Sequence, residues 1–526
     1  MHSIPNHRRR SPASGRPALV TASRSASLNA GRRHAELDRL EGGAAVDVVV
    51  IGGGITGVGV ALDAVTRGLR VALVERRDLA SGTSGASSKL AHGGLRYLRQ
   101  GEVAVAWESA RERHILMSRT APHLVRPMAF VAPLDEAMRP VYGAFAETGI
   151  RVGDLMRLAS GTRRRTLSAP RRIGPDEALR LIPVLRREDL RGAIIFWDGK
   201  LEDDARLVIA VARTAAANGA MILTYCEALE VARGRVAVRD TISGRSFEIA
   251  TTHVVNATGV WAQSLAPDVH LAPSKGSHVI VRDTTLGNLR ASLVVPIEGE
   301  SARWVGATPN GDGHVIIGVT DDAYSGRIDD RPSVTPGEER YLLHALSRAL
   351  AVPLTHEDVI GAYAGFRPLL RSGSESTRDL SRRHSIRTDP VTGMVTVVGG
   401  KLTTYRRMAQ DTVDRLLNGA GPRSRTSTLP LIGAAPRSIL RGVAAPERLV
   451  RRYGIEAPAV ASLAQGDASL LQPIAPGVPV LGVELLFGQR HEGALNLDDL
   501  LDRRVRLSLV PSERRSVEAA VAALVA

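Results

Sequence analysis

The run Val46-Asp47-Val48-Val49-Val50-Ile51-Gly52-Gly53-Gly54-Ile55-Thr56-Gly57 decides the fold of this chain. Its first six residues predict a short buried strand, and the apolar segment that continues to about Arg67 predicts a helix. Glycines between a strand and a helix let the backbone turn tightly and approach a ligand closely. A second strand is expected over 70–74, so the run begins a β-α-β unit of an α/β fold.

Glu75 stands at the end of that second strand. A carboxylate at this position can bind a ribose while the helix N-terminus faces a pyrophosphate. It also disfavours a 2′-phosphate, which favours FAD or NAD over NADP. Two later strand ends, at 257–259 and 399–401, favour FAD, because that long cofactor is clamped by segments scattered along the chain.

A second glycine-rich stretch, 84–98, reads Ser-Gly-Ala-Ser-Ser-Lys-Leu-Ala-His-Gly-Gly-Leu-Arg-Tyr-Leu. Serine, lysine and arginine side chains among glycines suit the binding of phosphates and other anions. The chain contains only four lysines: Lys89, Lys200, Lys275 and Lys401. Where arginine is the usual cation, a retained lysine suggests a compact charge or a shiftable pKa. Lys200, within Asp-Gly-Lys, indicates a surface turn.

Composition limits the class of protein. The net charge of +15 favours anionic partners, unless it only reflects a general preference for arginine. Aromatic residues make up 3% and no recognised nucleic-acid motif occurs, so we expect no nucleic-acid partner. The single cysteine, Cys226, excludes an intrachain disulfide and a cysteine-rich metal site. His491 and Glu492 are adjacent and lack a third ligand nearby, so no metal is expected.

Three parts are predicted along the chain. Residues 1–44 form a disordered basic tail and a short leading helix at 28–42, with an organelle transit peptide as the alternative for the tail. Residues 45–424 form the cofactor-binding domain, into which a mixed α+β substrate domain is inserted at about 131–200 and 271–354. Residues 425–526 form a helical C-terminal domain. No apolar run reaches the ~18–20 residues that cross a membrane.

Several motifs occur in the order typical of one family. They are Ser87–Leu98, Asp204–Leu207, Lys275–His278, Gly365–Leu369, Gly399–Arg406, His491–Leu500 and Arg503–Leu507. Over about residues 45–526, the chain resembles the FAD-dependent glycerol-3-phosphate dehydrogenases. The resemblance implies a two-domain flavoprotein with a Rossmann-like FAD-binding domain. It also implies oxidation of sn-glycerol 3-phosphate to dihydroxyacetone phosphate, with hydride transfer from C2 to flavin N5 and electron transfer to a membrane quinone.

The same resemblance implies a set of site residues. Substrate phosphate is expected to bind Arg96, Arg367 and Arg382, with the Tyr97 hydroxyl as a further partner and Arg383 as the alternative to Arg382. A base must remove the C2 hydroxyl proton, and His278 suits this role because imidazole titrates near pH ~6.5. Lys401 is the second candidate for the base, or it binds substrate and holds negative charge near the flavin. The expected cofactor-binding residues are Gly52, Gly54, Gly57, Glu75, Thr83, Ser87, Ser88, Lys89, His92, Gly93, Gly94, Ala257, Gly259, Gly400 and Thr403.

Some expectations stay open at this stage. Gly318-Val319-Thr320-Asp321-Asp322 stands where the family more often has Gly-Thr-Thr-Asp-Thr, so one hydroxyl is lost near the site. Oxygen could replace quinone as the acceptor, and another small hydroxy or amino acid could replace the substrate. We expect a cytoplasmic protein held peripherally at the inner face of the plasma membrane, through basic segments at 163–172 or 436–452. A homodimer is a family-level expectation.

Overall fold

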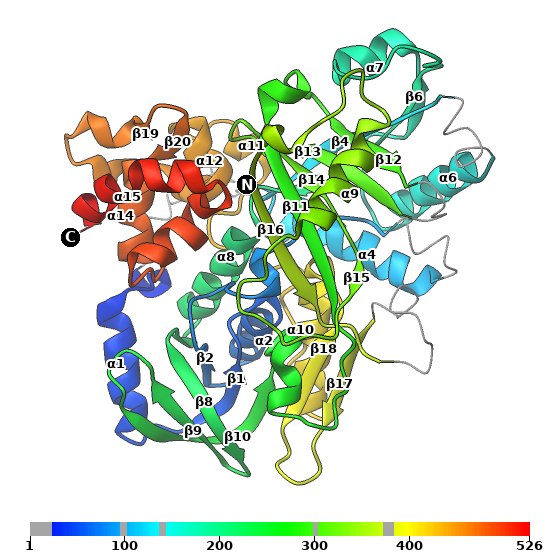
Figure 1. The fold of residues 1–526 in the computed structure, drawn as a ribbon. Coiled ribbons are helices and arrows are strands. Elements are labelled where there is room, and N and C mark those ends of the chain that lie inside the picture. Colours follow the sequence, from blue (N-terminus) through cyan, green and yellow to red (C-terminus); the bar gives the residue numbers. More distant parts are fainter. Residues whose placement is uncertain (1–23, 95–101, 136–143, 298–302, 372–382, 526) are drawn as a thin grey trace, which may run out of the picture.

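The computed structural model describes residues 24–94, 102–135, 144–297, 303–371 and 383–525. Figure 1 shows three parts: a lower sheet that contains β1 and β2, a second sheet above it, and a C-terminal domain beside the second sheet. The leading helix α1 (Ala30–Glu41) begins after Asn29, whose side chain accepts a hydrogen bond from the Arg32 backbone N–H. Of the tail expected to be disordered at 1–26, residues 1–23 lie outside the described residues, and Arg24–Ala26 form a short 3-10 helix.

The first sheet has the strand order β17-β18-β10-β1-β2-β7. Its strands are β1 (Val46–Ile51), β2 (Val71–Val74), β7 (Met221–Leu223), β10 (Ser246–Asn256), β17 (His384–Thr388) and β18 (Val395–Gly399), with β8 (Cys226–Ala232) and β9 (Arg235–Asp240) extending from β10. β1 pairs in parallel with both β2 and β10. The predicted β-α-β unit is therefore confirmed, with α2 at Ile55–Thr66.

Helices cover both faces of the first sheet, which explains the continuous apolar sequence of β1. Val48 and Val50 belong to the core beneath α2, α8 (Asp204–Ala217) and α10 (Tyr405–Leu416). Val49 and Ile51 point the other way, into a core shared with Leu37 of α1. The carboxyl ends of these parallel strands meet at one edge, where ligands bind in open α/β sheets.

The second sheet is mainly antiparallel. Its order is β15-β11-β14-β13-β12-β4-β6-β3, with β16 beside β11 and β5 beside β6. The strands are β3 (Leu90–Ala91), β4 (Val125–Pro133), β5 (Arg171–Ile173), β6 (Ala193–Leu201), β11 (Ser274–Arg282), β12 (Ser292–Pro296), β13 (Trp304–Pro309), β14 (His314–Gly318), β15 (Asp322–Ala323) and β16 (Val359–Arg367). β3, β16 and most of β4 lie outside the two insertions expected from the sequence.

The two faces of β11 have different partners. Val279 and Val281 pack into a core beneath α9 (Pro336–Ser347). Ile280 points to the opposite face, where it packs against Val510 of the C-terminal domain. His278 shares the side of Ile280, because side chains alternate along a strand. The sheet thus places His278 away from α9 and toward the first sheet.

Lys200 lies inside strand β6 and not in a surface turn, so that prediction is wrong. Its side chain is buried, and Nζ donates to the Leu201 carbonyl oxygen and to Asn310 Oδ1. A Cβ atom at Gly199 would lie 2.6 Å from the Ala91 carbonyl oxygen. Because Gly199 has no side chain, β3 can approach closely, and such an approach is one of the usual reasons for a glycine within a strand.

The C-terminal domain is mainly helical, as predicted. It contains α11 (Arg437–Leu440), α12 (Glu447–Tyr453), α13 (Ala457–Ala461), α14 (Gly482–His491), α15 (Pro511–Val525) and a small hairpin of β19 (Pro473–Ala475) and β20 (Val478–Leu481). Helices α4 (Val103–Ile115), α6 (Ala144–Ala159) and α7 (Pro175–Leu181) lie on the opposite side of the molecule in Figure 1. Among the described helices, none has both the length and the apolar character needed to cross a bilayer.

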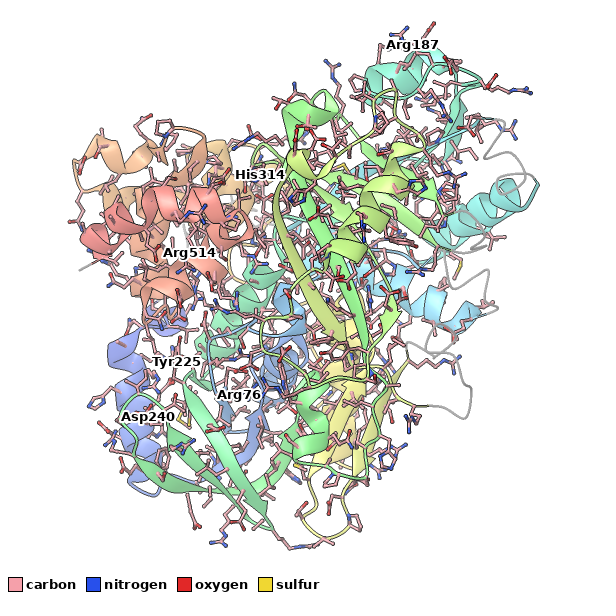
Figure 2. The ribbon with its side chains drawn as sticks, viewed as in Figure 1. Arg76, Arg187, Tyr225, Asp240, His314 and Arg514 are labelled. Atoms are coloured by element: carbon pink, nitrogen blue, oxygen red, sulfur yellow. The ribbon has the colours of Figure 1, made fainter. Side chains whose placement is uncertain are left out.

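Buried ion pairs join the C-terminal domain to the first sheet. Arg206–Glu492, Arg213–Glu456 and Arg504–Asp78 are bidentate pairs whose side chains are almost wholly buried. Removing one partner of such a pair typically costs ~3–5 kcal/mol, because the other charge stays buried and unpaired. Figure 2 shows Tyr225 at the same boundary, where its hydroxyl donates to Asp499 at 2.6 Å.

Two basic segments have different surroundings. Within 436–452, Arg448 and Arg452 form buried ion pairs with Glu484, so these cations face the protein interior and not a membrane. Arg163, Arg164 and Arg165 are exposed just beyond the end of α6. Of the two segments expected to contact a membrane, only the one at 163–172 keeps several exposed arginines in this way.

Candidate active site

A cavity of about 600 Å³ is lined by residues from both sheets. The first sheet contributes the carboxyl ends of β1, β2, β10 and β18, and the second contributes β11, β13 and β16. Eleven of the expected cofactor-binding residues line it: Gly52, Gly54, Glu75, Thr83, Ser87, Ser88, His92, Ala257, Gly259, Gly400 and Thr403. His278, Arg367 and Lys401 line it as well. Arg96, Tyr97 and Arg382 lie outside the described residues.

The glycine loop after β1 fits a bound dinucleotide. A Cβ atom on Gly57 would lie 1.9 Å from the Gly52 carbonyl oxygen, so the turn closes only with glycine. Gly52 itself has φ +112°, a left-handed value that favours glycine. Gly54 and Ile55, at the N-terminus of α2, line the cavity, and a helix N-terminus attracts a phosphate.

Glu75 lines the same end of the cavity. Its carboxylate accepts hydrogen bonds from the backbone N–H groups of Gly53, at 2.6 Å, and Arg77, at 2.9 Å. Burial raises the pKa of Glu75, while these two hydrogen bonds act in the opposite direction. The nearby Trp261 ring also lines the cavity and carries the Arg76 guanidinium 4.9 Å from its centroid. These groups suit the adenosine end of FAD.

Four of the expected cofactor-binding residues do not line the cavity: Gly57, Lys89, Gly93 and Gly94. Lys89 is fully buried, and its Nζ binds Asp204 Oδ1 at 2.8 Å. Gly93 donates its N–H to the carboxylate of Asp198, and a Cβ atom there would lie 2.2 Å from Arg113 Nη1. Lys89 and Gly93 therefore bind side chains of the protein itself, and these contacts stabilise the loop.

His278 lies on the part of the cavity wall that β11 of the second sheet contributes. Its Nε2 is 2.8 Å from Ser88 Oγ, and its ring stacks on Tyr363 with centroids 4.5 Å apart. Its Nδ1 has no hydrogen-bond partner among the described residues. Burial, followed by the charges of Arg367 and Lys89, lowers the pKa of His278 well below 6.5. The imidazole is therefore neutral at physiological pH, as a proton acceptor must be.

Arg367 is held at the end of β16 by three interactions. Its Nη1 donates to Asp321 Oδ1 at 3.0 Å and to Ser274 Oγ at 3.2 Å, and its Nη2 donates to the Thr320 carbonyl oxygen at 3.1 Å. Gly276 makes room for it, since a Cβ atom there would lie 2.4 Å from Arg367 Nη2. The guanidinium is thus fixed in position while it lines the cavity.

The segment that departs from the family pattern has a mainly structural role. Thr320 Oγ1 accepts the Ser277 backbone N–H at 3.0 Å, and Asp321 orients Arg367. Val319 lines the cavity where the family more often has a threonine. The hydroxyl and carboxylate that hold β11 and Arg367 are therefore kept. The threonine hydroxyl absent at 319 belongs to the cavity wall, whereas the second departure, Asp322, lies in β15.

Sequence reasoning missed several residues of the cavity wall and its support. Arg303 and Trp304, at the start of β13, line the cavity, and Tyr363 forms the platform for His278. Tyr363 also donates its hydroxyl to the Ser87 carbonyl oxygen at 2.9 Å, and burial raises its pKa well above 10. The only sequence pattern that pointed to Arg303 was an arginine directly before an aromatic residue at the start of a strand. The pattern does not show that this strand lies beside the site, which only the order of strands in the sheet reveals.

The expected absence of a metal rests on His491 and Glu492. Glu492 forms its bidentate pair with Arg206, and His491 Nδ1 lies 2.7 Å from Ser27 Oγ. No group of three or more metal-ligating side chains gathers within the described part of the chain.

Family and sequence comparisons agree with this geometry. The model described as FAD dependent oxidoreductase matches residues 47–415, and that of the C-terminal domain of alpha-glycerophosphate oxidase matches residues 391–526. Glycerol-3-phosphate dehydrogenase 1 of Mycobacterium tuberculosis is 46% identical over 508 residues, covering 94% of this chain and 98% of that protein. Glycerol-3-phosphate dehydrogenase of Synechocystis sp. is 31% identical, covering 89% of this chain and 90% of that protein.

Solved structures show the same architecture. The glycerol-3-phosphate dehydrogenase of Bacillus halodurans, complexed with FAD, superposes with a TM-score of 0.72 and 26% identity, covering 94% of this chain and 92% of that chain. The FAD-bound L-alpha-glycerophosphate oxidase of Mycoplasma pneumoniae has a TM-score of 0.56 at 18% identity, covering 74% of this chain and 99% of that chain, which speaks for the fold alone. The predicted fold class and the FAD cofactor are confirmed. The chain belongs to the glycerol-3-phosphate dehydrogenase family of FAD-dependent oxidoreductases.

Proposed function

We propose that the protein oxidises sn-glycerol 3-phosphate to dihydroxyacetone phosphate and passes the electrons to a membrane quinone. One observation carries the proposal: a neutral, buried His278 and the fixed cation Arg367 lie on the cavity wall that the second sheet contributes. The relatives that bear the name glycerol-3-phosphate dehydrogenase support the choice of substrate. FAD, when bound, supplies the acceptor for a hydride.

His278 acts as the base in this proposal. When its Nε2–H donates to Ser88 Oγ, the Nδ1 lone pair is free to take the proton of the substrate C2 hydroxyl. Tyr363 and Ser88 fix the ring so that the imidazole keeps one orientation. Because the pKa of His278 lies well below 6.5, protonation does not block it at neutral pH.

Cations on the cavity wall bind the substrate phosphate. Arg367 presents a planar guanidinium held by Asp321, which suits bidentate binding of a phosphate. Arg303 lies on the same wall and adds a second guanidinium. Lys401 follows the Gly399–Gly400 turn and lines the cavity together with Thr403, where its ammonium group would stabilise negative charge on a bound flavin.

An apolar surface on helices α4 and α6 supports the proposal that the electron acceptor is a quinone in a membrane. Five of the ten large apolar side chains that are exposed among the described residues lie on these two helices: Val103, Trp107, Val152, Leu155 and Leu158. The exposed arginines 163–165 follow directly after α6 and complement anionic lipid. α4 also contacts the turn at 402–404, which adjoins Lys401 and the cavity. We propose that this α4–α6 face rests on the bilayer.

Oxygen is the second candidate for the acceptor. It is favoured by the match of residues 391–526 to the C-terminal domain of alpha-glycerophosphate oxidase. The two functions share the substrate-oxidising half-reaction and differ only in how the reduced cofactor is reoxidised. An oxidase needs no lipid surface, so the α4–α6 face distinguishes the two.

The substrate half-reaction is tested without any acceptor. We expect anaerobic sn-glycerol 3-phosphate to bleach the flavin absorbance band near ~450 nm in the purified holoenzyme. Glycerol, lactate and glycine serve as controls that lack the phosphate. A flavin that stays oxidised with sn-glycerol 3-phosphate but bleaches with one of these controls would overturn the substrate assignment.

The acceptor is tested on the reduced enzyme. Mixing it with a short-chain quinone and, separately, with oxygen gives two reoxidation rates, and we expect the quinone to be faster. The Trp107→Asp and Leu155→Asp variants should bind anionic vesicles less tightly than the wild type. Val352→Asp, a change of an exposed valine away from α4 and α6, is the matched control. Faster reoxidation by oxygen, with vesicle binding unchanged in all variants, would favour the oxidase.

A further inference from the structure

A cluster of four charged side chains lies buried behind the loop that carries Ser88. Its members are Lys89, Asp203, Asp204 and Arg506, none of which is more than 9% exposed. Lys89 Nζ lies 2.8 Å from Asp204 Oδ1 and 3.3 Å from Asp203 Oδ2. Arg506 Nε lies 3.2 Å from Asp203 Oδ2, and its Nη2 lies 3.5 Å from Asp204 Oδ1. Two cations therefore balance two carboxylates in the interior.

Arg506 comes from the C-terminal domain, far in sequence from the other three. Its Nη1 donates to the Asp502 carbonyl oxygen at 2.8 Å, and its Nη2 donates to the Gly85 carbonyl oxygen. Its backbone has φ +65°, a left-handed conformation that is unfavourable for an arginine. Such conformations persist where the surrounding contacts determine them, and they concentrate at functional sites.

The cluster connects directly to the proposed base. Asp204 Oδ2 accepts from both the Ser87 backbone N–H, at 2.9 Å, and the Ser87 hydroxyl, at 2.8 Å. The next residue, Ser88, places its Oγ 2.8 Å from His278 Nε2. Arg506 thus holds the loop at Gly85, and Asp204 holds it at Ser87. The position of the Ser88 hydroxyl follows from these two contacts.

We propose that Arg506 is a positioning residue, which fixes the loop 85–88 and, through Ser88, the imidazole of His278. The C-terminal domain then takes part in catalysis although Arg506 does not line the cavity. The inference rests on the proposed role of His278 as the base. It assigns a function to the arginine-rich motif at 503–507, which the substrate and cofactor sites leave without one.

Charge balance gives a second consequence of removing Arg506. The charges that act on His278 are those of Arg367 and Lys89, and both lower its pKa. Arg452 also acts on Asp203, but it is paired with Glu484. Without Arg506, Lys89 is therefore the cation that the cluster itself keeps against its two buried carboxylates, and the cluster carries one net negative charge. A negative charge nearby stabilises the protonated imidazole. The pKa of His278 should therefore rise toward its ordinary value, which moves the acidic limb of the pH profile to higher pH.

The test compares three variants as FAD-loaded holoenzymes. Arg506→Met removes the charge and the donors, Arg506→Lys keeps the charge without the fork, and Arg515→Met removes an exposed arginine of the same domain as the control. The readouts are FAD content, KM for sn-glycerol 3-phosphate, and the rate constant of anaerobic flavin reduction across pH.

For Arg506→Met we expect the reduction rate to fall by about 10- to 100-fold, the range associated with a shift of ~1 Å in a reacting group. KM should stay unchanged because the cavity cations remain, and the acidic limb should move to higher pH. Arg506→Lys should also reduce the flavin more slowly, but the acidic limb of its pH profile should stay at the wild-type pH. Arg515→Met should match the wild type in both the rate and the pH profile.

Two outcomes would overturn the inference. In the first, Arg506→Met has the wild-type rate constant of flavin reduction and the wild-type pH profile. In the second, Arg506→Met reduces the flavin more slowly, but the acidic limb of its pH profile has not moved. If Arg506→Met does not retain FAD, Arg506→Lys decides, since a wild-type rate in that variant also overturns the inference. Failure of the wild-type flavin to be reduced by sn-glycerol 3-phosphate at any pH would instead sink the proposed function. The two failures are therefore distinguishable.

Discussion

Gly318 is the position at which a single methyl group should disable the site without touching FAD. A Cβ atom built there lies 2.2 Å from His278 Cδ2 and about 3.0 Å from two further ring atoms. Carbon atoms in contact are ordinarily ~3.5 Å apart, so the imidazole must move by about 1.3 Å. Tyr363 stacks on the ring, so little free space exists to absorb the movement.

The expected size of the effect follows from that displacement. A shift of more than ~1 Å in a reacting group can cost ~100-fold in rate, which corresponds to ~2.7 kcal/mol in the activation barrier. Movement of the ring away from Gly318 also disturbs the 2.8 Å contact between His278 Nε2 and Ser88 Oγ. We therefore expect Gly318→Ala to lower the rate constant of flavin reduction by about 100-fold.

The assay is anaerobic stopped-flow reduction of the flavin by sn-glycerol 3-phosphate, together with FAD content from the absorbance spectrum. Gly306→Ala is the matched control: Gly306 pairs with Gly318 across β13 and β14, and the atoms nearest to its Cβ position are 3.7 Å away. Gly306→Ala should reduce at the wild-type rate. Gly318→Ala with a wild-type rate, or with lost FAD, would refute the reasoning.

Three further outcomes are expected. His278→Asn should retain FAD but reduce it ~10²- to 10⁴-fold more slowly, the usual contribution of a general base; a loss under tenfold would remove His278 from that role. Gly57→Ala should purify with little FAD, because its Cβ would lie 1.9 Å from the Gly52 carbonyl oxygen, and a normal ratio of absorbance at ~280 and ~450 nm would contradict this. Burial lowers the pKa of His123 to about 3, so below pH ~6.5 the unfolded chain binds a proton that the folded one does not. The free energy of unfolding should then fall by up to ~1.4 kcal/mol per pH unit toward pH 3; in His123→Asn the dependence should be shallower, and an unchanged slope of thermal midpoint against pH would argue against it.

The parts of the fold that local sequence determines were predictable. The strand at 46–51, the helix after it and the second strand at 71–74 follow from apolar periodicity and from glycines at fixed places. Glu75 could be assigned to the dinucleotide end for the same reason, because it lies one helix and one strand beyond the loop. These elements need no knowledge of the rest of the chain.

Pairing between strands that are far apart in the sequence explains which parts of the fold could not be predicted. β16 pairs with β11 and β3 pairs with β6, although the paired residues are separated by 78 to 93 positions in the first case and by 108 to 110 in the second. No local pattern indicates such pairing, so the extent of the second sheet was not predictable. The misassignment of Lys200 has the same origin, since its glycine neighbour is explained only by the approach of β3.

The roles of individual site residues divide in the same way. His278, Arg367 and Lys401 were placed by motif, and the structure brings them to one cavity. Lys89 looked like a cofactor ligand because it stands among serines and glycines. Its partners, Asp203 and Asp204, lie more than a hundred residues later, and only the folded chain brings them together.

The buried pair between Asp78 and Arg504 has a consequence for the order in which the chain is made. The two residues are 426 positions apart, and synthesis proceeds at ~5–20 residues per second, so Asp78 emerges roughly 20 to 85 s before its partner. Throughout that interval Asp78 lacks the guanidinium that pairs with its carboxylate in the folded chain. A chain that ends before residue 504 cannot form this ion pair, so the Asp78 carboxylate stays hydrated. We expect such a chain to be bound by chaperones and degraded by proteases.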